Sequence, residues 1–175
     1  MICGSPEDES TQIGALISQE HMEKVESYIQ LGIEEGGNVL TGGTREMTGQ
    51  VGPSPEGAFL RPTVIDGLQH TSRTATEEIF GPVVTIHRFE SDEEAIEIAN
   101  STEYGLAGSI WSNDTDRAHK IAQKIQTGIV WVNTWLHRDL RTPFGGVKNS
   151  GLGREGGAWS LGFFSEPLNV CIKHD

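Results

Sequence analysis

Positive charge and aromatic rings are concentrated in one segment of the chain, residues 131–146, which read WVNTWLHRDLRTPFGG. The segment brings Arg138 and Arg141 close in sequence to Trp135 and Phe144. An arginine presents a planar fork of N–H donors that fits a carboxylate with two parallel hydrogen bonds. The loop therefore raises the question of which carboxylate it faces.

A second segment with chemical potential is TEEIFGPVV, residues 76–84. A carboxylate such as that of Glu78, placed at a turn, can accept hydrogen bonds from sugar hydroxyls, and Phe80 could lie beside a flat ring. The structural alternative is that Gly81 and Pro82 only redirect the chain into a strand. The residue types alone favour this structural alternative.

Three other patterns do not support a site. Residues 151–156, GLGREG, match a dinucleotide fingerprint formally, but no strand precedes them and the chain nearly ends after them. Residues 158–162, AWSLG, resemble a nucleophile elbow, but Ala158 replaces its first glycine. No histidine forms an i, i+4 pair with a nearby acid, so no metal site is expected.

Composition narrows the class of protein. The chain has 175 residues, enough for a substantial core, and its 13 Lys and Arg against 25 Asp and Glu give a net charge of -12. This acidity argues against nucleic-acid partners and anionic membrane surfaces. The apolar runs are too short for a membrane span, and the first ten residues lack the pattern of a secretory signal. Cys3 and Cys171 form no C-x-x-C pair, so a cytoplasmic location is expected.

The elements that must position these residues alternate between helix and strand. Helices are predicted from Ser18 to Gly36, over residues 92–100 behind a capping box of Ser91 and Glu94, and from Asn113 or Asp114 to Gly128. The apolar face of the first helix is expected to hold Met22, Val25, Ile29 and Ile33. Short helices are expected near residues 71–79 and 157–164.

Strands are predicted between these helices, at residues 38–43, 58–65, 83–89, 107–112, 129–133 and 168–173. Residues 42–57 are rich in Gly, Pro, Ser and Thr and are expected to form a loop suited to a hinge or insertion. Alternation of strands and helices of these lengths indicates an α/β fold with a largely parallel sheet.

Taken together, the motifs resemble a known family. EEIFGP, YGLAGSIWS, GIVWVN, PFGGVKNSGLGREGG and the last expected strand, in this order, resemble the C-terminal part of the NAD(P)-dependent aldehyde dehydrogenases. Within that superfamily, NTWLHRDLRTPFGG is most similar to the 2-hydroxymuconic and 2-aminomuconic semialdehyde dehydrogenases. The resemblance implies that residues 1–150 are part of the catalytic domain, that residues 151–175 are a linker helix and an oligomerisation strand, and that the dinucleotide-binding domain is absent.

The resemblance also assigns roles at matching positions. Glu78 matches the glutamate that holds the nicotinamide ribose hydroxyls of NAD, and Phe80 matches the phenylalanine near the nicotinamide. Phe144 matches an aromatic residue that lines the aldehyde pocket. Arg138 falls at a substrate-pocket position that is commonly aromatic elsewhere in the superfamily.

A muconic semialdehyde carries a carboxylate remote from its aldehyde, so Arg138 is predicted to anchor that carboxylate, with Arg141 as a weaker candidate. Trp135 and Phe144 would pack against the conjugated chain. In the alternative, the two arginines pair with Asp139 or with a neighbouring subunit. The side chain of His137, in the same loop, is expected to be structural or exposed.

The family mechanism uses a cysteine thiolate, a glutamate base and an asparagine oxyanion donor. The resemblance places all three upstream of this chain, so Cys3 is not expected to be the nucleophile, and Cys171 is expected to be a packed core thiol. The chain is therefore expected to be an inactive fragment of an enzyme that acts on a small aldehyde and oligomerises through its last strand. Two alternatives are a non-catalytic subunit that pairs with full-length copies and an unrelated α/β binding module.

Overall fold

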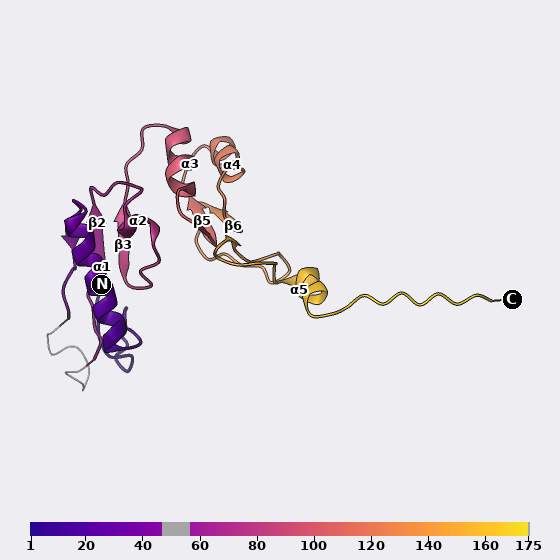
Figure 1. The fold of residues 1–175 in the computed structure, drawn as a ribbon, viewed down its shortest axis with the longest axis horizontal. Helices are drawn as coiled ribbons and strands as arrows, with labels where there is room; N and C mark the ends of the chain where they lie inside the picture. The colour runs from indigo at the N-terminus through magenta and orange to yellow at the C-terminus, as the bar shows by residue number, and fades with distance from the viewer. Residues whose placement is uncertain (47–56, 175) are drawn as a thin grey trace. The chain divides into compact units, whose positions relative to one another are not determined.

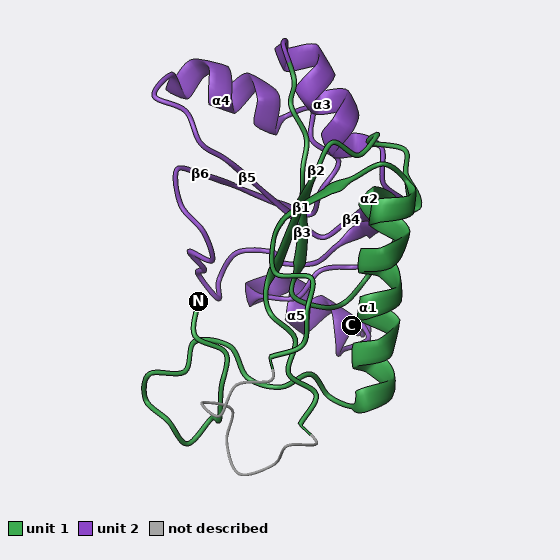
Figure 2. Cartoon of the chain, turned by 90° about the vertical axis from the view of Figure 1, so that its left-hand side faces the viewer, with its two compact units in different colours: residues 1–89 green, residues 90–175 purple. Residues whose placement is uncertain are grey.

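A computed structural model of the chain describes residues 1–46 and 57–174, and most of the loop expected over residues 42–57 lies outside these residues. The chain divides into two compact units, Met1–Phe89 and Glu90–Asp175 (Figures 1 and 2).

The first unit begins with helix α1 (Gln19–Glu34). Ser18 caps it as predicted, because its side-chain oxygen accepts a hydrogen bond from the His21 N–H at 3.1 Å. The helix ends just before Gly36, which has a positive φ of 92°. The predicted apolar face is wrong at one position: Ile33 is 47% exposed, and Gly32 is buried in its place.

A three-stranded sheet completes the first unit, with the order β1 (Asn38–Thr41), β2 (Thr63–Asp66), β3 (Val83–Ile86). β2 pairs with β3 in parallel and with β1 antiparallel. The short helix α2 (Arg73–Thr76) precedes β3 and is shorter than predicted.

The core of this unit lies on the inner face of α1. Residues of α1 at helical spacing pack against the segments that lead into β2 and β3. The buried cluster consists of Met22, Val25, Ile29, Ala58, Leu60 and Ile79. Side chains three and four residues apart share one helix face, so this cluster explains why α1 is a fixed support for the turn that precedes β3.

Among the described residues, the second unit contains three helices and two strand pairs. β5 (Ala107–Ile110) pairs in parallel with β6 (Ile129–Val132), and α4 (Thr115–Ala122) lies between them in sequence. The very short strands β4 (Tyr104–Gly105) and β7 (Val147–Lys148), which were not predicted, form an antiparallel pair. The unit begins with α3 (Asp92–Asn100), and α5 (Gly157–Phe163) follows the β7 segment.

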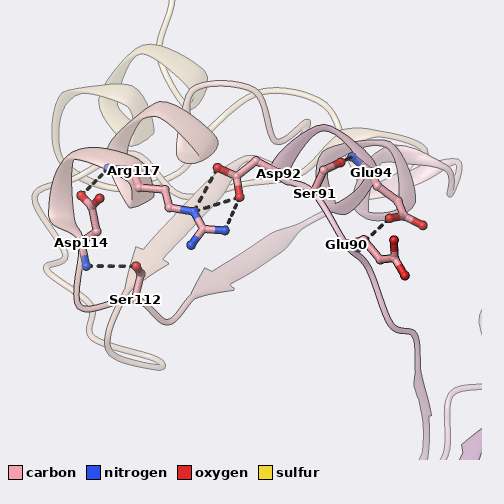
Figure 3. Close-up of polar contacts among 7 residues, drawn as sticks. All are labelled: Glu90, Ser91, Asp92, Glu94, Ser112, Asp114 and Arg117. Atoms are coloured by element: carbon pink, nitrogen blue, oxygen red, sulfur yellow. Dashed lines mark hydrogen bonds and ion pairs between the residues drawn. The ribbon is translucent and has the colours of Figure 1, made fainter.

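Polar contacts fix the starts of α3 and α4 (Figure 3). Ser91 accepts a hydrogen bond from the Glu94 N–H at 3.2 Å, and the Glu94 carboxylate accepts one from the N–H of Glu90. Asp114, rather than Asn113, caps α4. The Arg117 Nε donates to both oxygens of Asp92, at 2.9 and 3.0 Å, and so links the two helices.

Two predictions about this unit are wrong. α4 ends at Ala122 rather than at Gly128, since a turn separates the helix from β6. Residues 168–173 have no hydrogen-bonded neighbour among the described residues, so the strand expected to pair with a second subunit stays a prediction. Cys171 in this segment is exposed rather than packed in a core.

Candidate functional site

In the first unit, the predicted cofactor residues lie on a turn between α2 and β3. Glu78 is exposed, and its carboxylate makes no hydrogen bond or ion pair with any residue that the structure describes. The Phe80 ring is 74% exposed. Two residues apart, the unpaired carboxylate can accept hydrogen bonds from ribose hydroxyls, and the exposed aromatic ring can pack against a flat ring.

The turn is held by contacts with α1. Ile79, between the two candidate residues, is buried in the core cluster. Gly81 packs so closely on α1 that a Cβ there would lie 2.6 Å from the Val25 Cγ2. The His21 Nε2 lies 2.7 Å from the Phe80 carbonyl oxygen, and the two rings meet edge to face. Phe80 has a φ of 58°, which is uncommon for a non-glycine residue, and these contacts stabilise that conformation.

The neighbouring acid, Glu77, has a structural role instead. Its carboxylate binds Arg73 through two hydrogen bonds, at 2.7 and 3.1 Å, and accepts one from the Tyr28 hydroxyl at 2.6 Å. The hydrogen bonds from Arg73, and next the one from Tyr28, lower the pKa of Glu77 from 4.5 to about 2. Glu77 therefore connects α2 to α1, while Glu78 remains free to bind a ligand.

Replacing Glu77 by glutamine should lower the free energy of unfolding of the chain at pH 7. Because the folded-state pKa is depressed, the carboxylate stabilises the fold above about pH 4.5, and this stabilisation disappears as pH falls towards about 2. Urea unfolding at pH 7 and pH 3 should show a larger difference between Glu77→Gln and wild type at pH 7. Glu78→Gln, whose carboxylate has no partner among the described residues, is the matched control and should unfold like wild type at both pH values.

In the second unit, the aromatic loop is anchored by Trp131 in β6. Trp131 is 6% exposed, and its indole N–H donates to the His137 carbonyl oxygen at 2.8 Å. Trp135 packs edge to face on Trp131 with ring centroids 5.0 Å apart, and it remains 58% exposed. The side chain of His137 is exposed, as expected. The loop thus leaves the Trp135 ring exposed, while the buried Trp131 fixes the loop backbone.

Arg138 and Phe144 come together in this loop. The centre of the Arg138 guanidinium lies 4.1 Å from the centroid of the Phe144 ring, which is within the range of a cation–π contact. The Arg138 Nη2 also donates to the Glu155 Oε1 at 3.2 Å. The pairing with Asp139 that the sequence left open is therefore not found for Arg138. Glu155 was not singled out by the sequence, because no spacing rule links it to this loop.

Arg141 faces its own neighbour instead. The Arg141 Nε lies 2.9 and 3.1 Å from the two Asp139 carboxylate oxygens, and the Arg141 Nη2 donates to the Asp139 Oδ2 at 2.5 Å. These hydrogen bonds lower the pKa of the Asp139 carboxyl. Of the two arginines, Arg138 is therefore the one whose fork is open, with a single side-chain hydrogen bond to the residues that the structure describes.

A cavity of about 420 Å³ in the second unit borders Phe144 and Glu155, the two residues that Arg138 contacts. Phe144 and Glu155 form part of its wall, and Phe163, Phe164 and Leu106 form much of the apolar remainder. A volume of this size suits a small organic molecule. Phe144 therefore contacts the Arg138 guanidinium and also borders the cavity.

Neither the Cys3 thiol nor a cluster of acidic side chains forms a second reactive site among the described residues. Cys3 is 5% exposed, and burial raises the pKa of its thiol, so the reactive thiolate is disfavoured. In residues 1–46 and 57–174, no group of three His, Cys, Asp or Glu side chains could hold a metal ion. No helix in the same residues is long and apolar enough to cross a membrane.

The comparison with protein families agrees with the motifs. The family described as "Aldehyde dehydrogenase family" matches residues 1–170, and the chain belongs to this family. It is 49% identical to a 2-hydroxymuconic semialdehyde dehydrogenase of Pseudomonas sp. (strain CF600), over 99% of this chain and 35% of that protein. It is 45% identical to the human 2-aminomuconic semialdehyde dehydrogenase, over 98% of this chain and 35% of that protein.

Solved structures give the same fold. The chain matches HpcC from Thermus thermophilus with a TM-score of 0.90 and 38% identity, over 99% of this chain and 36% of that one. It matches betaine aldehyde dehydrogenase from Staphylococcus aureus, in complex with NAD+, with a TM-score of 0.88 and 39% identity, over 93% of this chain and 32% of that one. The chain thus spans about a third of the length of the relatives it matches.

Proposed function

We propose that this chain is the C-terminal part of an NAD-dependent dehydrogenase that oxidises a carboxylated, muconic-type semialdehyde to the corresponding acid. The observation that carries the proposal is the open guanidinium of Arg138, which lies on the Phe144 ring with one side-chain hydrogen bond to a described residue. Relatives named as hydroxymuconic and aminomuconic semialdehyde dehydrogenases match almost the whole chain. An arginine fork of this kind suits a substrate that carries a carboxylate.

On the cofactor side, Glu78 accepts hydrogen bonds from the nicotinamide ribose hydroxyls and Phe80 packs beside the nicotinamide. The free carboxylate of Glu78 and the exposed ring of Phe80 fit this role. A nicotinamide held by these residues would supply the acceptor for the hydride that leaves the aldehyde carbon. His21 and the buried Ile79 keep the Phe80 turn in place, so the ring does not have to reorganise when the cofactor binds.

On the substrate side, Arg138 binds the remote carboxylate and fixes the position of the aldehyde end. Phe144 and Trp135 pack against the conjugated chain that joins the two ends. Arg141 is the weaker second candidate, because its guanidinium is already paired with Asp139. The nucleophile and base are expected outside residues 1–175, so this chain alone should not oxidise aldehydes.

We further propose that the complete enzyme is a cytoplasmic homo-oligomer that pairs through residues 168–173, with residues 151–175 as the linker helix and oligomerisation strand. Three apolar side chains at every second position of this segment are 69–85% exposed: Leu168, Val170 and Ile172. This spacing is that of one face of a strand, and the exposure indicates that the face lacks a neighbour. The same feature favours the alternative that the chain alone is a non-catalytic subunit. Co-expression with a full-length copy would yield mixed oligomers in that case.

The direct test compares NADH formation by the full-length enzyme with 2-hydroxymuconic semialdehyde and with hexanal. If Arg138 anchors a carboxylate, kcat/KM for the semialdehyde should exceed that for hexanal by about tenfold or more, the equivalent of one charged hydrogen bond. The isolated chain should form no NADH with either. Equal kcat/KM values for the two aldehydes would contradict the proposed substrate class.

A further inference from the structure

We propose that Glu155 is a positioning residue for Arg138 and thereby helps to determine specificity for carboxylated aldehydes. The inference rests on the proposed function, in which Arg138 binds the carboxylate of the substrate. Glu155 follows the arginine in sequence and is separated from Phe144 by the glycine-rich turn of residues 145–153.

Backbone hydrogen bonds hold Phe144 and Glu155 opposite each other. Phe144 and Glu155 form a reciprocal antiparallel bridge, in which each N–H donates to the carbonyl of the other at 2.8 Å. Residues directly opposite each other in an antiparallel pair direct their side chains to the same face. The Phe144 ring and the Glu155 carboxylate are therefore fixed side by side on one face of the pair.

Arg138 contacts both side chains of this pair. Its guanidinium lies 4.1 Å from the Phe144 ring centroid, and one terminal nitrogen donates to Glu155 at 3.2 Å. The ring restricts the guanidinium in one direction, and the carboxylate restricts its rotation within the plane. An arginine side chain loses much rotamer entropy when it binds, so a guanidinium that is already oriented binds a carboxylate at lower cost.

The hydrogen bond to Glu155 leaves most of the Arg138 guanidinium available to a ligand. The contact uses one oxygen of Glu155 and one nitrogen of Arg138. The other nitrogens of the guanidinium can therefore bind a carboxylate through two hydrogen bonds. The side chains of Arg138 and Glu155 are 43% and 64% exposed, and exposed ion pairs are weak. Glu155 can therefore orient Arg138 without competing strongly for it.

The test measures the ratio of kcat/KM for 2-hydroxymuconic semialdehyde to that for hexanal in the full-length enzyme. This ratio cancels any effect of Glu155 that acts equally on both substrates. Glu155→Ala should lower the ratio about threefold, in keeping with the strength of an exposed pair. Glu155→Gln should restore most of it, because the amide oxygen accepts the same hydrogen bond.

A double-mutant cycle separates this inference from the proposed function. In the Arg138→Ala background, Glu155→Ala should leave the ratio unchanged, since the residue acts only through the arginine. If Arg138→Ala lowers the ratio but Glu155→Ala leaves it at the wild-type value or raises it, the positioning role is wrong while the anchor stands. If Arg138→Ala itself has no effect on the ratio, the proposed substrate class fails and the positioning role fails with it.

Discussion

Replacing Arg138 by alanine in the full-length enzyme should lower kcat/KM for 2-hydroxymuconic semialdehyde by about 10- to 150-fold. A hydrogen bond to a charged group contributes about 1.5–3 kcal/mol, and each 1.4 kcal/mol corresponds to roughly a factor of ten in rate. The carboxylate lies away from the reacting carbon, so its binding energy orients the aldehyde rather than stabilising the developing charge. Steady-state kinetics with NAD at saturation would measure the loss.

The neutral substrate provides the control for this change. Hexanal has no carboxylate, so kcat/KM for it should change little when Arg138 becomes alanine. Arg141→Ala is the matched variant, because Arg141 lies in the same loop but is occupied by Asp139. It should reduce activity towards the semialdehyde far less. Equal losses for the two aldehydes in Arg138→Ala would mean that the arginine supports the loop rather than binding the substrate.

Much of the local structure of the chain could be predicted from the sequence. Ser18, Ser91 and Asp114 cap their helices because a short polar side chain can satisfy a free N–H of the first turn, and this depends only on neighbours in sequence. The parallel pairing of β5 and β6 follows from a strand–helix–strand order. These features are local, so their signals survive in a single sequence.

The contacts that distinguish the candidate site residues could not be predicted in this way. Glu77 and Glu78 are adjacent and chemically identical, yet one is bound by Arg73 and Tyr28 and the other is free of any partner among the described residues. The pairing of Arg138 with Glu155 depends on the bridge between Phe144 and Glu155, which closes a glycine-rich turn. Such contacts are set by tertiary geometry, and no periodicity or spacing in the sequence encodes them.

A second large effect, on stability, is expected for the substitution Gly128→Ala. Gly128 precedes β6 and lies against the segment that follows Phe144. A Cβ at this position would lie 1.5 Å from the carbonyl oxygen of Gly145 and 2.7 Å from its carbonyl carbon. Both are backbone atoms, so no side-chain rotation can relieve the overlap. The substitution should lower the free energy of unfolding by about 3 kcal/mol, the upper part of the range for overpacked sites.

Because Gly145 is bonded to Phe144, the same displacement should disturb the contact between Phe144 and Arg138. Gly128→Ala should therefore also reduce the preference of the full-length enzyme for the carboxylated aldehyde. Gly162→Ala is the matched control, since Gly162 lies in α5 and a Cβ there meets no atom within 4 Å. It should be neutral or slightly stabilising, because alanine is favoured over glycine in a helix. Urea unfolding would compare the two variants. Equal midpoints for Gly128→Ala and Gly162→Ala would show that the backbone around Gly145 can move to accept a methyl group.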